Sequence, residues 1–280
     1  MPPRVHPYTT QLTGGRKEQQ DTCLVLDGGE KLTFLAVVAD GAGGHLGGRE
    51  AAHAVSETSR VMFAQHGGVL PHPEADLEAL CVASHEAINK LGENPKNAPR
   101  STVVALYIVA GKAWWVHVGD SRLYRMQGRR IVERSRDHTM AQILLEQGEI
   151  DDSEVGSHPD RIKLLKALGG ESPAKPSAGS AEVAEGDCFL LCSDGFWENL
   201  KLREVERCLA AGPTQASLDR LAAKAVSRNG ESGDNVTACA IQIGDRPCVR
   251  RTGWLFAGIS ALAGAVPANR RFGSQSKEPL

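Results

Sequence analysis

The sequence predicts an α+β fold in which antiparallel sheets pack against helices. Apolar runs of strand length alternate with helical patterns that come in pairs, instead of one helix after each strand. Three strands follow closely on one another at 101–110, 112–118 and 122–126, and links this short join antiparallel neighbours. The pattern does not contain the regular strand–helix–strand units of a doubly wound parallel sheet.

The first half of the chain is expected to supply a strand and a helix pair. An apolar run at 32–39 predicts a buried strand, and a shorter apolar segment occupies 22–26. Apolar residues recur at helical spacing over 45–65 and again over 75–91, which predicts two helices.

The second half repeats this plan. Helical spacing predicts four helices, and apolar runs before Asp194 and after Asn235 predict two strands. Two polar stretches rich in Gly, Pro and Ser predict surface loops. The predicted helices are 139–147, 161–168, 201–211 and 214–228, and the predicted loops are 149–160 and 169–180.

Composition describes a globular protein with no sign of nucleic-acid binding. The chain has 280 residues, 41% of them hydrophobic and 24% charged, which suffices for a substantial core. The formal net charge is −2, so we expect no nucleic-acid partner. The seven cysteines contain no C-x-x-C pair, which argues against a disulfide framework or a structural zinc site and favours the reducing cytoplasm. The N-terminus shows no signal-peptide pattern.

The C-terminal segment differs in charge from the rest. Residues 246–280 carry a net charge of +5 and residues 1–245 carry −7, so we predict one domain over 1–245 followed by a basic and apolar tail. Residues 252–269 hold no charged side chain, but the apolar stretch is short, rich in Gly and broken by Pro267. We expect a docking helix or an unfolded tail; the alternative is a helix at the inner-membrane surface or a tail anchor.

Acidic residues stand at the ends of several predicted strands. Two apolar runs end in Asp-Gly, at Asp40-Gly41 and Asp194-Gly195, and Asp234 opens a third run. Carboxylates are good ligands for Mg²⁺ and Mn²⁺. Because more than 150 residues separate the first from the second, only folding could bring them together.

Each of these motifs also has a structural explanation. Asp-Gly is common in turns, and Asp40 could cap a helix beyond the Gly-rich stretch that leads to His45. Such a Gly-rich turn could instead bind phosphate. Arg16 lies in a charged run that suits either solvent or phosphate, and His138 is ambiguous between a ligand and a loop residue.

Taken in order, these segments are similar to the PP2C (PPM) family of metal-dependent serine/threonine protein phosphatases, in their compact bacterial form. The resemblance spans residues 16 to about 243. It rests on Arg16 with Asp21, 38–45, 100–102, 118–122, 137–139, 167–169, 191–195 and 233–237. It implies a four-layer αββα sandwich, in which two antiparallel sheets are flanked by helix pairs.

The resemblance also implies roles for single residues. Asp40 would bridge two Mn²⁺ or Mg²⁺ ions, the Gly41 carbonyl would bind one of them, and Asp194 and Asp234 would complete the shell of the other. Asp120, with Asp194, would hold a third ion. The remaining assignments concern the substrate and its water: Arg16 would bind the phosphate, Asp21 would hold a metal-bound water, and His45 and His138 have no assigned role.

The implied reaction is attack of a metal-activated water on phosphoserine or phosphothreonine. The implied partners are phosphoproteins and a cognate Ser/Thr kinase, in bacterial signalling that includes secretion control, and the implied state is a monomer. Two alternatives stay open: a non-catalytic phosphoprotein-binding module, and a hydrolase of another phosphoester. The chain departs from the family at Gln19, at Ala42 and at Lys166. Because of Ala42 we assign no protein general acid.

Overall fold

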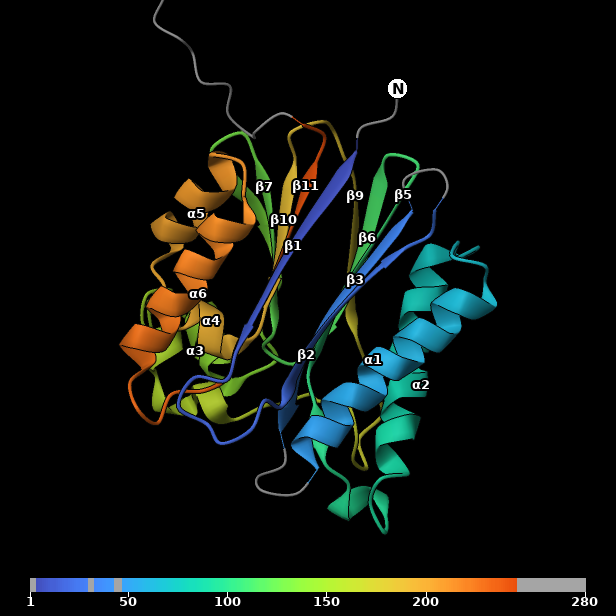
Figure 1. Ribbon diagram of the computed structural model, residues 1–280. Coiled ribbons are helices and arrows are strands. Elements are labelled where there is room, and N and C mark those ends of the chain that lie inside the picture. The colour runs from blue at the N-terminus through green and yellow to red at the C-terminus, as the bar shows by residue number, and fades with distance from the viewer. Residues whose placement is uncertain (1–3, 30–32, 43–46, 246–280) are drawn as a thin grey trace, which may run out of the picture. The chain divides into compact units, whose positions relative to one another are not determined.

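Two antiparallel sheets pack face to face, with helices on both outer sides (Figure 1). The computed structural model describes residues 4–29, 33–42 and 47–245. The predicted α+β class is confirmed, and so is the sandwich of sheets flanked by helices.

The first sheet has five strands, and each pair of neighbours is antiparallel. It joins the two ends of the described chain, because the first strand pairs with the last along its whole length. Its strands, in spatial order, are β1 (Val5–Leu12), β11 (Val236–Ile243), β10 (Cys188–Cys192), β7 (Arg122–Gln127) and β8 (Arg130–Arg134).

The second sheet is also antiparallel. A two-residue strand, β4 (Arg100–Ser101), pairs with the end of its second strand at Gly41 and Ala42. The other strands, in spatial order, are β2 (Asp21–Asp27), β3 (Phe34–Ala42), β5 (Val103–Val109), β6 (Lys112–Val118) and β9 (Ser177–Glu182).

Strand β3 shows why its sequence is a continuous apolar run. Successive side chains of a strand point to opposite faces. Leu35 and Val37 pack toward the helices, whereas Ala36 and Val38 pack toward the other sheet. Both faces are therefore buried, and neither can be polar.

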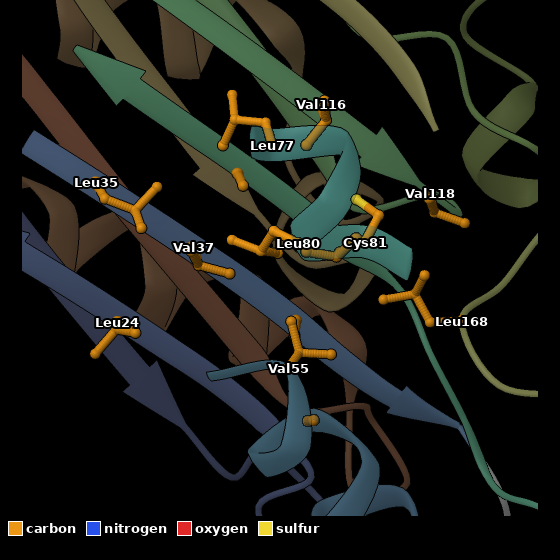
Figure 2. Close-up of a cluster of buried hydrophobic side chains, with 14 of the residues drawn as sticks. Leu24, Leu35, Val37, Val55, Leu77, Leu80, Cys81, Val116, Val118 and Leu168 are labelled. Carbon is orange, nitrogen blue, oxygen red and sulfur yellow. The ribbon is translucent and has the colours of Figure 1, made fainter. Parts of the chain in front are cut away.

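Helices α1 (Gly48–Gln65) and α2 (Pro73–Asn89) cover the second sheet. Figure 2 shows Val55 of α1 and Leu77 and Leu80 of α2 among strand residues such as Leu35. The first sheet is covered by α4 (Asp194–Trp197), α5 (Leu202–Ala210) and α6 (Gln215–Asn229), with α3 (Met140–Glu146) below them in Figure 1.

The segment 149–182 corrects two predictions. The helix predicted at 161–168 is wrong: short 3₁₀ turns occur at η2 (Val155–Ser157) and η3 (Pro159–Ile162), and irregular chain follows. The loop predicted at 169–180 is wrong at its end, because β9 begins at Ser177 and forms a sheet edge. A third 3₁₀ turn, η1 (Pro95–Asn97), precedes β4.

Two features of the remaining chain bear on the earlier expectations. Within the described ranges, no helix has both the length and the hydrophobicity needed to cross a bilayer. The tail at 246–280 and His45 lie outside the described residues, so the proposed division at residue 245 stays a prediction.

Candidate metal centre

The five aspartates of the predicted site come from five different strand ends. Asp21 begins β2 and faces Asp40 of β3 in the strand register. Asp120 follows β6, Asp194 follows β10, and Asp234 precedes β11. The negative charges of the other four all raise the pKa of Asp40, in addition to the larger effect of its burial. The fold therefore brings all five carboxylates within electrostatic reach of one another.

Two glycines allow the backbone segments of the site to approach this closely. A Cβ atom on Gly195 would lie 2.1 Å from the carbonyl oxygen of Asn235 and 3.3 Å from Cβ of Asp234. A Cβ atom on Gly41 would lie 1.9 Å from the carbonyl oxygen of Gly48. Since real Cβ contacts are not this short, both Asp-Gly motifs need glycine for close approach.

Burial and mutual repulsion raise the pKa values of these carboxylates. Burial, opposed by a hydrogen bond from Ser193 and assisted by the charges of Asp194 and Asp234, raises the pKa of Asp21 to about 7. Burial and the charge of Asp234 raise the pKa of Asp194 to about 6. Burial, with the charge of Asp194, also raises the pKa of Asp120. A bound cation would supply the missing positive charge and release these protons.

The donor atoms fit a hard divalent ion. Oδ1 of Asp194 is buried and has no hydrogen-bond partner in the described part of the protein. A buried acceptor in this condition is costly, and a cation would satisfy it. Carboxylate and carbonyl oxygens are the ligands that Mg²⁺ and Mn²⁺ prefer.

The carboxylate of Asp234 is engaged by other groups of the protein. Among the residues that the structure describes, no group of three or more His, Cys, Asp or Glu side chains is already placed to hold a metal ion. One predicted ligand is turned elsewhere: Oδ2 of Asp234 accepts a hydrogen bond of 2.7 Å from Nη2 of Arg16. Its Oδ1 accepts one of 2.8 Å from the backbone N–H of Asn235.

Arg16 lies in the loop between β1 and β2, with a little over half of its side chain exposed. Asn235 holds this loop in place through three hydrogen bonds. Its Nδ2 donates to the carbonyls of Thr13 and Glu18 at 2.8 and 3.0 Å, and its Oδ1 accepts from the backbone N–H of Gln20 at 2.8 Å. The sequence interpretation gave Asn235 no role, although the Asp-Asn pair before β11 was visible.

Asp21 is held by a residue that precedes β2 and by one that follows β10. Its Oδ2 accepts a hydrogen bond of 2.8 Å from the Ser193 hydroxyl, and both residues are buried. Its backbone N–H donates to Oε1 of Gln19 at 3.0 Å. Gln19, which departs from the family pattern, thus makes a polar contact with Asp21.

His138 supports the turn that carries Asp120. Its backbone N–H donates to the carbonyl of Gly119 at 2.9 Å, and its Nδ1 accepts from the Gly119 N–H at 3.1 Å. Its ring stacks on His117 with centroids 4.7 Å apart. Burial and the charges of His117 and Lys166 lower the pKa of His138 to about 3, so the imidazole is neutral near pH 7.

Glu198 is an acidic residue that the sequence interpretation missed. Burial and the charge of Asp194 raise the pKa of Glu198 to about 8, which makes it part of the same electrostatic cluster. Nε of Arg161 donates to its Oε1 at 2.7 Å. Beside it, Nε1 of Trp197 donates to the Asp120 carbonyl at 2.9 Å. Glu198 stands four residues after Asp194, a spacing that could have indicated its proximity.

Two cavities border this region. One of about 820 Å³ is lined by Trp197, Glu198 and several basic side chains. The other, of about 520 Å³, begins at Ala42, directly after the Gly41 carbonyl. The smaller one adjoins the predicted site, because Ala42 directly follows Gly41, one of the predicted metal-binding positions.

Known proteins share this sequence pattern and this fold. A family model described as protein phosphatase 2C matches residues 15–229, which is most of the chain. The chain belongs to the protein phosphatase 2C family. The family predicted from the ordered motifs is therefore confirmed.

One curated relative is the serine/threonine protein phosphatase PstP of Mycobacterium tuberculosis, with 30% identity over 214 residues. The alignment covers 75% of this chain and 40% of that relative, so the chain spans less than half of the length of PstP.

Two solved structures are similar to this chain. The catalytic domain of PstP in complex with two manganese ions has a TM-score of 0.69 and 26% identity, covering 86% of this chain and 99% of that one. PppA of Pseudomonas aeruginosa, described as a key regulatory component of T6SS, has a TM-score of 0.70 and 28% identity, with 86% and 98% covered.

Proposed function

We propose that this protein hydrolyses phosphoserine and phosphothreonine in proteins, with two bound Mn²⁺ or Mg²⁺ ions. The observation that carries the proposal is the cluster of buried carboxylates whose pKa values are raised, with Oδ1 of Asp194 left without a partner in the described residues. Membership of the protein phosphatase 2C family supports the activity. The two manganese ions bound to the PstP catalytic domain support the metal requirement.

Four groups of this chain would hold the two ions: the carboxylates of Asp40, Asp194 and Asp234 and the carbonyl of Gly41. Asp120 and Asp194 would hold a third. When bound, the ions supply the Lewis acidity that activates water and neutralises charge on the phosphoryl group.

Arg16 would bind the phosphate of the substrate. A guanidinium group matches two phosphoryl oxygens at once, and the exposed position of Arg16 leaves it accessible. For this the side chain must leave Oδ2 of Asp234, which also frees that carboxylate for a metal. One movement would therefore prepare both the phosphate site and the metal site.

Asp21 would orient the attacking water. Because the Ser193 hydroxyl fixes Oδ2, the carboxylate is held in one orientation. The leaving serine or threonine oxygen needs a proton. We assign no side chain of this protein as its donor. Ala42 carries only a methyl group, and the neutral, half-buried His138 has both ring nitrogens engaged, with Gly119 and Ser177.

In the cell, the protein would reverse the action of a Ser/Thr kinase in bacterial signalling. The similarity to PppA supports a setting in secretion control. We propose that the catalytic unit acts as a monomer.

Release of phosphate from a phosphothreonine peptide with added Mn²⁺ tests the proposal. We expect activity in the wild type, and its loss on adding EDTA or in Asp194→Asn. Asp219→Asn is the matched control, because the side chain of this exposed aspartate of α6 accepts a hydrogen bond only from Gln215 in the described part of the protein. Its activity should equal that of the wild type.

Two outcomes would overturn the proposal. Folded, Mn²⁺-loaded protein that binds the phosphopeptide without releasing phosphate would indicate a binding module. Release from sugar phosphates and not from the peptide would indicate a metabolite phosphatase.

A further inference from the structure

A basic groove lies beside the predicted metal centre. Ala42 and Arg100 pair across β3 and β4, next to the pair formed by Gly41 and Ser101. The cavity of about 520 Å³ has Ala42 and Arg100 on one side and parts of the loop 164–175 on the other. It therefore begins one residue from the carbonyl that is predicted to bind a metal.

The groove carries three cationic side chains and one carboxylate. The cations are Arg100, Lys166 and Lys175, and the carboxylate is Glu171. In the described part of the protein, none of the three cations forms an ion pair. Nη1 of Arg100 donates to the carbonyls of Ala98 and Pro99, the latter at 3.3 Å. Nζ of Lys166 donates to the Lys175 carbonyl at 3.4 Å and lies 3.5 Å from Nε2 of His138. These partners are all uncharged at neutral pH, so the positive charges have no counter-charge in the described residues.

The groove also offers apolar contact. Leu165 is 47% exposed and Leu164 is half-buried, and both line the cavity. Exposed leucine beside unpaired cations suits a polypeptide with acidic and apolar side chains better than it suits a small sugar phosphate.

The outer wall of the groove is fixed in place. Leu168 and Ser101 exchange two backbone hydrogen bonds, of 2.7 and 3.1 Å. The backbone of Gly170 is held on both sides by the Asn89 side chain of α2, at 2.6 and 3.1 Å. A Cβ atom on Gly170 would lie 2.6 Å from Cζ of Arg100, so the glycine packs directly on the guanidinium. A preformed wall binds a ligand with less loss of conformational entropy.

We propose that this groove binds acidic residues that flank the phosphorylated residue of the substrate, and so selects phosphosites with acidic surroundings. An extended peptide advances about 3.3 Å per residue, so a groove that begins beside Gly41 receives the immediate neighbours of the phosphorylated residue. This inference rests on the proposed phosphatase function.

The test compares two phosphothreonine peptides, one with two glutamates on each side of the phosphothreonine and one with glutamines in their place. We expect the wild type to hydrolyse the acidic peptide with a kcat/KM about fivefold higher, since each exposed charge pair contributes modestly. The preference should shrink at high salt, where such pairs are screened. The double variant Lys166→Gln with Lys175→Gln should prefer the acidic peptide by less than about twofold.

Arg130→Gln is the matched control. It removes one positive charge at the start of β8, opposite the end of β7 that lies away from Asp120, and Arg130 has no ion pair in the described residues. This variant should retain the full preference of the wild type.

Each outcome has one meaning. Failure of the wild type to release phosphate from either peptide overturns the proposed function itself. Equal hydrolysis of both peptides by the wild type leaves the phosphatase proposal standing and overturns the acidic preference. A preference that persists in the double variant, or that Arg130→Gln abolishes equally, overturns the assignment to this groove.

Discussion

Nη2 of Arg16 lies 2.7 Å from Oδ2 of Asp234, so the residue predicted to bind phosphate holds a residue predicted to bind metal. Oδ2 of Asp234 cannot bind a metal ion while it accepts this hydrogen bond, and the same bond keeps Nη2 of Arg16 from a phosphate. A cation at Asp234 repels the guanidinium, and a phosphate attracts it. The pair would therefore couple metal loading to substrate binding in the proposed function.

Removal of the Arg16 guanidinium should strengthen metal binding and weaken the reaction with substrate. In Arg16→Ala, Asp234 loses a competing partner, and we expect Mn²⁺ to bind about two- to fivefold more tightly, as measured by titration calorimetry. The kcat/KM for a phosphopeptide should fall about 10- to 100-fold, because a charge-assisted contact to phosphate is lost. Arg49→Ala, which removes another exposed arginine paired with Glu18, should change neither quantity more than about twofold. Unchanged Mn²⁺ affinity in Arg16→Ala would show that the ion pair does not compete with the metal.

Stabilisation by Mn²⁺ should grow with pH. The pKa of Asp21 is raised to about 7 and that of Asp194 to about 6, so the metal-free folded protein holds protons that the unfolded chain has already released. This contribution to stability is present at low pH and is lost as the pH rises through 6 and 7. Mn²⁺ replaces the protons, so the rise in Tm on adding Mn²⁺ should be larger at about pH 8 than at about pH 5.5. An equal rise in Tm at both pH values would show that protons and Mn²⁺ do not compete for these carboxylates.

The positions of Asp40, Asp194 and Asp234 were predictable because each ends or precedes an apolar run of strand length, whereas Asp21 and Asp120 took their roles from the family resemblance. Asp40 and Asp194 end such runs, and glycine next to them marks a close approach of backbone. Asn235 and Glu198 were not predictable in the same way. Their partners, the Thr13 carbonyl and the Arg161 side chain, are distant in sequence and meet them only in the folded protein.

The segment 161–182 shows where periodicity fails. Ile162 and Leu165 suit a helix in spacing, yet both are exposed, and the backbone instead bridges to Ser101 and Thr139. Strand β9 has a sequence of small and polar residues with weak strand preference. It forms because β6 offers an edge and because Gly179 leaves room for the Trp115 ring, which a Cβ atom would meet at 2.5 Å. Tertiary pairing decides the structure at both places.

His138 should make the protein less stable in acid. Because burial lowers its pKa to about 3, the unfolded chain takes up a proton first as the pH falls below about 6.5. Its contribution to stability is thus complete above that pH and is lost as the pH falls toward 3. We expect the free energy of unfolding of His138→Gln, measured with urea, to decline less than that of the wild type between about pH 7 and pH 5. The exposed His66→Gln should decline as the wild type does. Parallel declines in all three proteins would exclude His138 as the titrating group.

Breaking the buried ion pair of Arg122 and Asp137 should lower the stability of the protein more than breaking an exposed ion pair does. Nη2 and Nε of Arg122 donate to the two carboxylate oxygens of Asp137 at 2.6 and 2.8 Å, and the side chains are only 7% and 1% exposed. Asp137→Asn leaves a buried guanidinium without its counter-charge, which should cost about 3–5 kcal/mol in the free energy of unfolding. The double variant Arg122→Met with Asp137→Leu removes both charges and should lose much less. Glu18→Gln, which breaks an exposed pair, should cost less than about 1 kcal/mol.

The same pair supports the predicted third metal position, because the Arg122 guanidinium lies 3.3 Å from the centroid of the Trp197 ring and that ring donates to the Asp120 carbonyl. Asp137→Asn should therefore also weaken Mn²⁺ binding, which calorimetry on the folded variant can measure. Since Asp137 makes no hydrogen bond with Asp40 or Asp234 in the described residues, binding of two ions should survive and only the third ion should be lost. Loss of all Mn²⁺ binding by a folded variant would instead show that the whole carboxylate cluster depends on this pair.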